Sequence, residues 1–71
     1  MMREYPVPTK EEEEELRRLR QEAGMTIPQI AEALHTHPSN IGDFENGKRG
    51  IDPDLIEKLK KRYKLIIQYN A

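Results

Sequence analysis

The chain has 71 residues, enough for one small domain that buries only about 60% of the surface its unfolded form exposes. It contains no cysteine, which excludes disulfide bonds and thiolate metal sites. The net charge of −1 excludes a strongly basic polyanion binder, and no apolar run approaches the roughly 20 residues that span a membrane. We therefore expect a soluble, cytoplasmic domain without membrane contact.

The charge is unevenly distributed along the sequence. Residues 11–15 are all glutamate, and we interpret this run as the solvated first turn of a helix rather than as a site for a partner. From residue 16 onward there are ten Lys and Arg and seven Asp and Glu, so this part of the chain has a net charge of +3. This balance is mildly favourable for a phosphate-facing surface but would not by itself indicate DNA.

The N-terminal part is predicted to be an arm followed by a helix. Residues 1–8 contain two prolines, which disfavour helix at their own positions and at the positions before them, so we expect an extended arm. Thr9 and Glu12 have the spacing of a capping box, which starts a helix. Gly24 adopts a left-handed C-terminal conformation at the least cost. The first helix is therefore predicted over residues 10–23.

Two short helices joined by a tight turn are predicted next, over residues 27–34 and 38–46. Their inward-facing residues, at helical spacing, are Ile30, Ala31, Leu34, Ile41 and Phe44. The three residues between the helices allow only a sharp turn, so the helices should meet at a steep angle. Ala31 is expected at their crossing, where a larger side chain would hold them apart. A plain helical hairpin is the alternative interpretation.

The C-terminal part is predicted to be a fourth helix and a tail. Asp52 followed by Pro53 is the favoured signature of a helix start, and we predict this helix over residues 53–63. From residue 63 to residue 70 every second side chain is Tyr, Leu or Ile, and this period of two, rich in β-branched and aromatic residues, is typical of a strand, although the same residues also fit an extension of the helix. We expect an extended or strand-like tail that pairs with a second copy across a two-fold axis.

Residues 16–63 resemble the λ-repressor/Cro-type helix-turn-helix domain, also called the xenobiotic-response-element-like family. The resemblance rests on Leu-Arg-x-Leu-Arg-x-x-x-Gly-Met-Thr-x-x-x-Ile-Ala-x-x-Leu, followed by Ile-x-x-Phe-Glu-Asn-Gly-Lys-Arg, and it covers about two-thirds of the chain. It implies an all-α, compact four-helix domain over residues 9–63, or five elements if the tail over residues 64–71 is counted. It also implies a homodimeric, sequence-specific regulator of double-stranded DNA, of phage repressor, Cro or antitoxin type, without a cofactor.

The resemblance also implies which residues touch DNA. The outward face of the predicted helix 38–46 is where relatives read base edges in the major groove. The expected base-reading residues are His37, Ser39, Asn40 and Asp43. The expected phosphate-contacting residues are Thr26, Gln29, Asn46, Lys48 and Arg49. An Asn can bond an adenine edge and an Asp can accept from a cytosine amino group. This face lacks Lys and Arg, unlike that of most DNA readers, and Ile27 stands where the family usually has a phosphate-contacting Gln.

Other functions have weaker support in the sequence. A protein-interaction module of antirepressor type is the alternative, because Asp43, Ile27 and the near-zero net charge all disfavour DNA. His35 and His37 have no third ligand nearby, so we expect no metal site. His37, Ser39 and Asp43 include the residue types of a catalytic triad, but one short helix cannot give them the required geometry. We therefore expect no catalytic residues and no enzyme activity.

Overall fold

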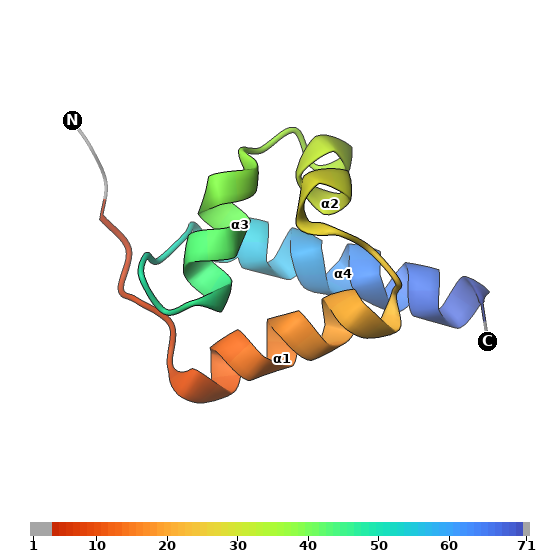
Figure 1. Ribbon diagram of the computed structural model, residues 1–71, viewed down its shortest axis with the longest axis horizontal. Helices are drawn as coiled ribbons and strands as arrows, with labels where there is room; N and C mark the ends of the chain where they lie inside the picture. The colour runs from red at the N-terminus through yellow and green to blue at the C-terminus, as the bar shows by residue number, and fades with distance from the viewer. Residues whose placement is uncertain (1–3, 71) are drawn as a thin grey trace.

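The computed structural model describes residues 4–70, and within this range the chain forms four helices and no strand. The helices are α1 (Lys10–Glu22), α2 (Ile27–Ala33), α3 (Pro38–Glu45) and α4 (Pro53–Tyr69). α1 packs along α4, while α2 and α3 contact each other and α3 also contacts α1 (Figure 1). The all-α prediction is confirmed. Every predicted helix start agrees with the structure, and the first three helices end one residue earlier than predicted.

Local capping interactions fix the helix starts. Thr9 and Thr26 each close a capping box, with Glu12 and Gln29 as the respective partners. In the first box the Thr9 backbone N–H donates to the Glu12 carboxylate at 3.0 Å, and the Glu12 backbone N–H donates to the Thr9 hydroxyl at 3.2 Å. Asp52 starts α4 by accepting from a backbone N–H at 2.9 Å. These contacts satisfy N–H groups that a helix start would otherwise leave unpaired, which is why the sequence predicts the starts well.

Two residues with a left-handed backbone conformation lie in the turns before α2 and α3. Gly24, with φ 69°, follows α1, and His35, with φ 55°, lies in the turn between α2 and α3. His35 is not a glycine, and a non-glycine residue accepts this φ at some cost. The turn brings α2 against α3, and Ala31 of α2 is buried, with 1% of its surface exposed.

The core lies where the four helices meet. Its buried members are Leu16, Ala23, Ile30, Ala31, Ile41, Phe44, Ile51, Leu59 and Tyr63. Every helix contributes at least one of them, so none of the four can detach without exposing apolar surface. In the described residues, no helix is both long enough and apolar enough to cross a membrane.

A buried ion pair ties α1 to α3. Glu45 is 3% exposed, and its carboxylate accepts from Arg20 Nε at 2.8 Å and from Arg20 Nη2 at 3.0 Å. Arg17 donates to the backbone carbonyl of the same glutamate. Hydrogen bonding to Glu45 raises the pKa of Arg20, although burial acts against this shift. The bidentate geometry fixes the distance and rotation between the two helices.

The prediction of an extended or strand-like C-terminal tail is wrong, because α4 continues as one helix to Tyr69. Ile66 and Ile67 pack against the core cluster, and helical spacing is what places both of them there. A lone strand would also have left a row of backbone groups without partners. The last turns carry two exposed apolar side chains, Leu65 at 62% and Tyr69 at 90%. Residue 71 of the predicted tail lies outside the described residues.

The N-terminal arm crosses the loop before α4. Residues 4–9 have no regular secondary structure, and residues 1–3 of the predicted arm lie outside the described residues. The Tyr5 hydroxyl donates to the Asp52 carboxylate at 3.1 Å. At Gly50, which is buried, a Cβ atom would overlap the carbonyl oxygens of Tyr5 and Pro6. The arm therefore lies directly on the loop backbone.

Candidate nucleic-acid interface

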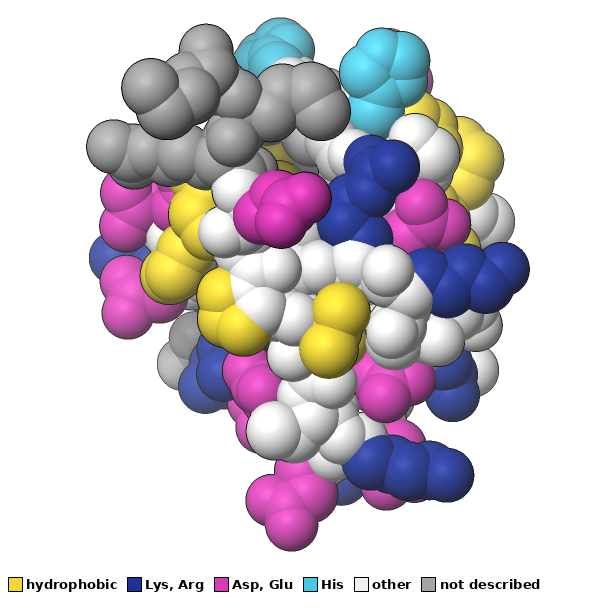
Figure 2. All heavy atoms as spheres, turned by 90° about the vertical axis from the view of Figure 1, so that its left-hand side faces the viewer, with side chains coloured by type: hydrophobic (Ala, Val, Ile, Leu, Met, Phe, Trp, Pro, Cys, Tyr) yellow, Lys and Arg dark blue, Asp and Glu magenta, His cyan; other side chains and the backbone are white. Residues whose placement is uncertain are grey.

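α3 has one buried face and one open face. Ile41 and Phe44 point into the core and are each 1% exposed, whereas Ser39 is exposed. Figure 2 looks at the side of the molecule that carries α3, and it shows histidine side chains at the upper edge and Lys and Arg beside Asp and Glu below them. The two signs of charge are interspersed on this face, with no large patch of either.

The predicted base-reading residues lie on or beside the open face of α3. His37 occupies the N-cap position, is exposed, and makes no side-chain capping bond. Ser39 lies in the first turn and is exposed, while Asn40 and Asp43 are half-buried. The structure thus brings the four side chains to one surface, as expected from their spacing. Asn40 and Asp43 both contact one further side chain.

That side chain is Arg49, from the loop after α3. Its Nη1 donates to Asn40 Oδ1 at 3.0 Å, and its Nη2 lies 3.8 Å from Asp43 Oδ2. On its other side, Asn40 Nδ2 donates to the Thr36 hydroxyl at 3.4 Å. The prediction that this face lacks Lys and Arg is wrong, because the loop after α3 supplies Arg49. No sequence pattern predicts this, since it depends on the course of the loop.

The remaining predicted phosphate-contacting residues lie around this face and around the start of α2. Thr26 and Gln29 are exposed, but their side chains are joined in the capping box of α2. Asn46 is exposed, and its Nδ2 donates to the Gly42 carbonyl at 2.9 Å, which caps the end of α3. Lys48 is exposed in the following loop. Of these side chains, the Lys48 ammonium is the cationic one, and it is suited to an electrostatic contact with phosphate.

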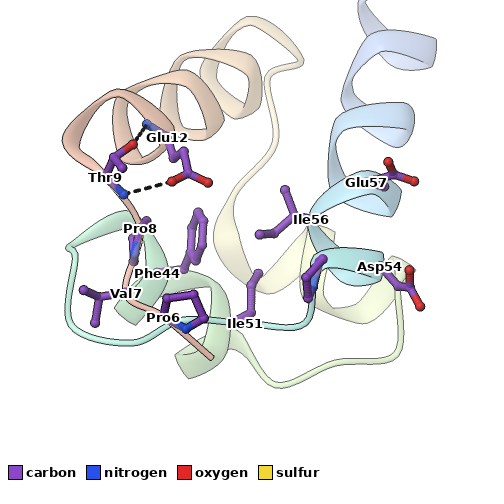
Figure 3. Close-up of a pocket in the computed structure, with 11 residues that line it drawn as sticks. Pro6, Val7, Pro8, Thr9, Glu12, Phe44, Ile51, Asp54, Ile56 and Glu57 are labelled. Carbon is purple, nitrogen blue, oxygen red and sulfur yellow. Dashed lines mark hydrogen bonds between the residues drawn. The ribbon is translucent and has the colours of Figure 1, made fainter. Parts of the chain in front are cut away.

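An apolar pocket of about 530 Å³ lies on the inner side of α3, beneath the arm. Phe44, Ile51 and Ile56 contribute its apolar lining, and the starts of α1 and α4 form its rim (Figure 3). Within residues 4–70, no three His, Asp or Glu side chains are grouped closely enough to hold a metal ion.

Comparison with known proteins assigns the family. Residues 14–65 match the family model described as "Helix-turn-helix domain". The chain belongs to the helix-turn-helix family. In this helix-turn-helix domain, α2 and α3 are the paired helices, and the turn between them contains His35.

Two curated relatives resemble this helix-turn-helix domain. The competence pilus inhibition repressor of Acinetobacter baylyi is 42% identical over 48 residues, which cover 68% of this chain and 44% of the relative. The HTH-type transcriptional regulator PrpR of Mycobacterium tuberculosis is 41% identical over 54 residues, which cover 76% of this chain and 11% of the relative. The match therefore spans less than half the length of either relative. No solved structure matches the chain significantly.

Proposed function

We propose that this helix-turn-helix domain binds double-stranded DNA in a sequence-specific manner and regulates transcription, with α3 in the major groove. The observation that carries the proposal is the open face of α3. This face presents Ser39, Asn40 and the guanidinium of Arg49 above a helix whose opposite face is fully buried. An α-helix fits the major groove, and amide, hydroxyl and guanidinium groups are the ones that read base edges there.

The names of the relatives, a repressor and a transcriptional regulator, support this proposal. The structure also weakens one argument for the alternative, a protein-interaction module of antirepressor type. That argument relied on the negative charge of Asp43, but Arg49 lies within ion-pair distance of this carboxylate and offsets its repulsion of phosphate. We therefore favour a cytoplasmic repressor of Cro or antitoxin type that acts as a homodimer.

The test is selection of bound sequences from a random double-stranded DNA library, followed by fluorescence polarisation titrations at several salt concentrations. The wild-type domain should bind the selected sequence saturably and more tightly than unrelated DNA. Lys48→Ala should weaken binding to all sequences alike and reduce the slope of log K against log salt by about one, because one phosphate contact is lost. Asn40→Ala should relax the preference at one base pair by about 1–3 kcal/mol.

The matched control for Lys48→Ala is Lys64→Ala, which removes the same charge from the exposed surface of the distal part of α4. It should leave the salt slope nearly unchanged. If no selected sequence binds saturably even at low salt, the DNA proposal fails and the interaction module replaces it.

A further inference from the structure

Arg49 places its charge over the start of α3, although it belongs to the loop that follows this helix. Its Nη1 is 3.0 Å from the side-chain oxygen of Asn40, and Asn40 is the third residue of α3. The guanidinium therefore reaches back from the loop to the first turn of the helix. The side chain is 56% exposed, so the guanidinium is accessible to a ligand in front of this face.

This placement differs from that of a side chain that only contacts phosphate. Such residues hold their charge at the edge of the reading face, where the DNA strands pass. The first turn of the second helix is instead the part that meets base edges in helix-turn-helix complexes. The Arg49 guanidinium lies beside this turn, in contact with two of the side chains predicted to read bases.

The contacts of Asn40 indicate that it holds Arg49 in place. Both polar ends of its amide are engaged, since Nδ2 donates to Thr36 and Oδ1 accepts from Arg49. Asp43 lies 3.8 Å from the other terminal nitrogen of the guanidinium. These contacts use only some of the guanidinium N–H donors and leave the others for a ligand. Restricting the side chain before binding lowers the entropy lost when the complex forms.

We propose that Arg49 is a specificity-determining residue that reads a guanine in the major groove, and that Asn40 and Asp43 are its positioning residues. The planar guanidinium matches the O6 and N7 acceptors of guanine, and this pairing is the commonest specific contact between proteins and DNA. The inference rests on the proposed DNA-binding function and assigns the base that the α3 face prefers. It gives Arg49 a different role from the phosphate contact expected from the sequence.

The test uses the sequence selected by the full chain and a set of probes that differ from it at single base pairs. One further probe set carries 7-deazaguanine, which lacks the N7 acceptor, at one guanine at a time. The wild-type chain should prefer G·C at one position by about ten- to a hundredfold and should lose affinity when that guanine lacks N7. Arg49→Ala should bring this preference close to unity and should be insensitive to the missing N7.

Two further variants test separately the planar shape of the Arg49 guanidinium, its charge, and its positioning by Asp43. Arg49→Lys keeps the charge, so it should keep the salt slope, but it should lose most of the guanine preference because a lysine cannot present a planar fork. Asp43→Asn should reduce the sensitivity to the missing N7, which a purely structural role of Asp43 would leave unchanged. Lys48→Ala is the matched control and should bind more weakly while retaining the full guanine preference.

The outcomes distinguish this inference from the proposed function. If the wild type selects a sequence and folded Arg49→Ala and Arg49→Lys keep its base preferences at every position, the base-reading role is overturned while DNA binding stands. Folding of each variant is checked by circular dichroism. If the wild type selects no sequence at all, both the inference and the proposed function fail.

Discussion

Glu45 and Tyr63 are neighbours in the core, and they show opposite ways of burying a polar group. The Glu45 carboxylate accepts two hydrogen bonds from Arg20, which compensate its loss of hydration. The Tyr63 hydroxyl is also buried but has no hydrogen-bond partner among the described residues. Burial raises the pKa of Tyr63, and the nearby negative charge of Glu45 raises it further, although Arg20 partly opposes this.

Tyr63→Phe should therefore raise the free energy of unfolding by about 1 kcal/mol at pH 7, because it removes a hydroxyl that is buried without a partner. Urea denaturation of both chains measures the difference. Phe44→Tyr is the reverse control, because it adds a hydroxyl to another fully buried ring and should be destabilising. A clear loss of stability in Tyr63→Phe would mean that the hydroxyl is hydrogen-bonded.

The wild type and Tyr63→Phe should also differ in how their free energies of unfolding change at alkaline pH. Below a pH of about 10 the phenol is neutral in both the folded and the unfolded state, so its full contribution to stability is present. Above this pH the unfolded chain releases the phenol proton first, since the folded state holds the higher pKa. Wild-type stability should therefore fall more steeply than that of Tyr63→Phe as pH rises above about 10. If the free energies of unfolding of the two chains changed in parallel with pH, Tyr63 would have the same pKa in the folded and the unfolded state.

The sequence predicts the start of every helix, but it does not predict where α4 ends. The starts depend on caps within three residues of one another, such as Thr9 with Glu12, and these can be read directly from the sequence. The end of α4 depends on whether Ile66 and Ile67 reach the core, which is a property of the packed fold. Residues 64–70 satisfy both the helical and the strand pattern, so only tertiary contact decides between them.

In the candidate site, too, local sequence patterns predict some features and not those that depend on the packed fold. The sequence predicts which side chains α3 presents, because helical periodicity alone separates Ser39 and Asn40 from Ile41 and Phe44. It does not predict that Arg49 folds back onto Asn40. That contact depends on the path of the loop from Asn46 to α4, which has no repeating pattern.

Gly50 allows the N-terminal arm to lie on the loop before α4. Gly50→Ala should push the arm away from the loop and lower the free energy of unfolding by about 1–3 kcal/mol, because the new methyl group would overlap backbone atoms that cannot move independently. Denaturation in urea measures the loss, and faster proteolysis within residues 4–9 should accompany it.

Gly42→Ala is the matched control for this change. Gly42 lies within α3, and a Cβ there would meet only Ile27 Cδ1 at 3.9 Å, an ordinary contact. This variant should be more stable than the wild type by about 1 kcal/mol, because alanine favours the helix. Equal stability of Gly50→Ala and the wild type would show that the arm does not pack on the loop in solution.

The whole molecule is elongated, with extents of 41 × 25 × 17 Å, and the end of α4 projects at the side opposite α3 (Figure 1). The exposed Leu65 and Tyr69 lie four residues apart on this projecting end and so share one face of the helix. We propose that these two side chains form the homodimer contact that was expected from a strand-like tail. Pairing through them would leave both α3 faces open.

Leu65→Glu combined with Tyr69→Glu should convert a dimer into a monomer without loss of helix, because both side chains are already exposed. Sedimentation equilibrium over a wide concentration range measures the mass, and circular dichroism measures the helix content. Gln68→Glu, which adds a negative charge without removing an apolar side chain, is the control and should remain dimeric. A wild-type chain that stays monomeric at high micromolar concentration would rule out a dimer in the absence of DNA.

The opposite placement of α3 and the end of α4 has a consequence for the layout of an operator. Two copies joined at their α4 ends would carry their α3 helices on the far sides of the pair, each body having a long dimension of 41 Å. Because the pair is longer than one body, the separation of the two α3 helices would exceed the roughly 34 Å of one turn of B-DNA, so the two sites would have to recur at a higher multiple of the helical repeat. Such an operator would be an inverted repeat whose centres lie about 20 base pairs or more apart, rather than the roughly 10 base pairs of half-sites on adjacent turns.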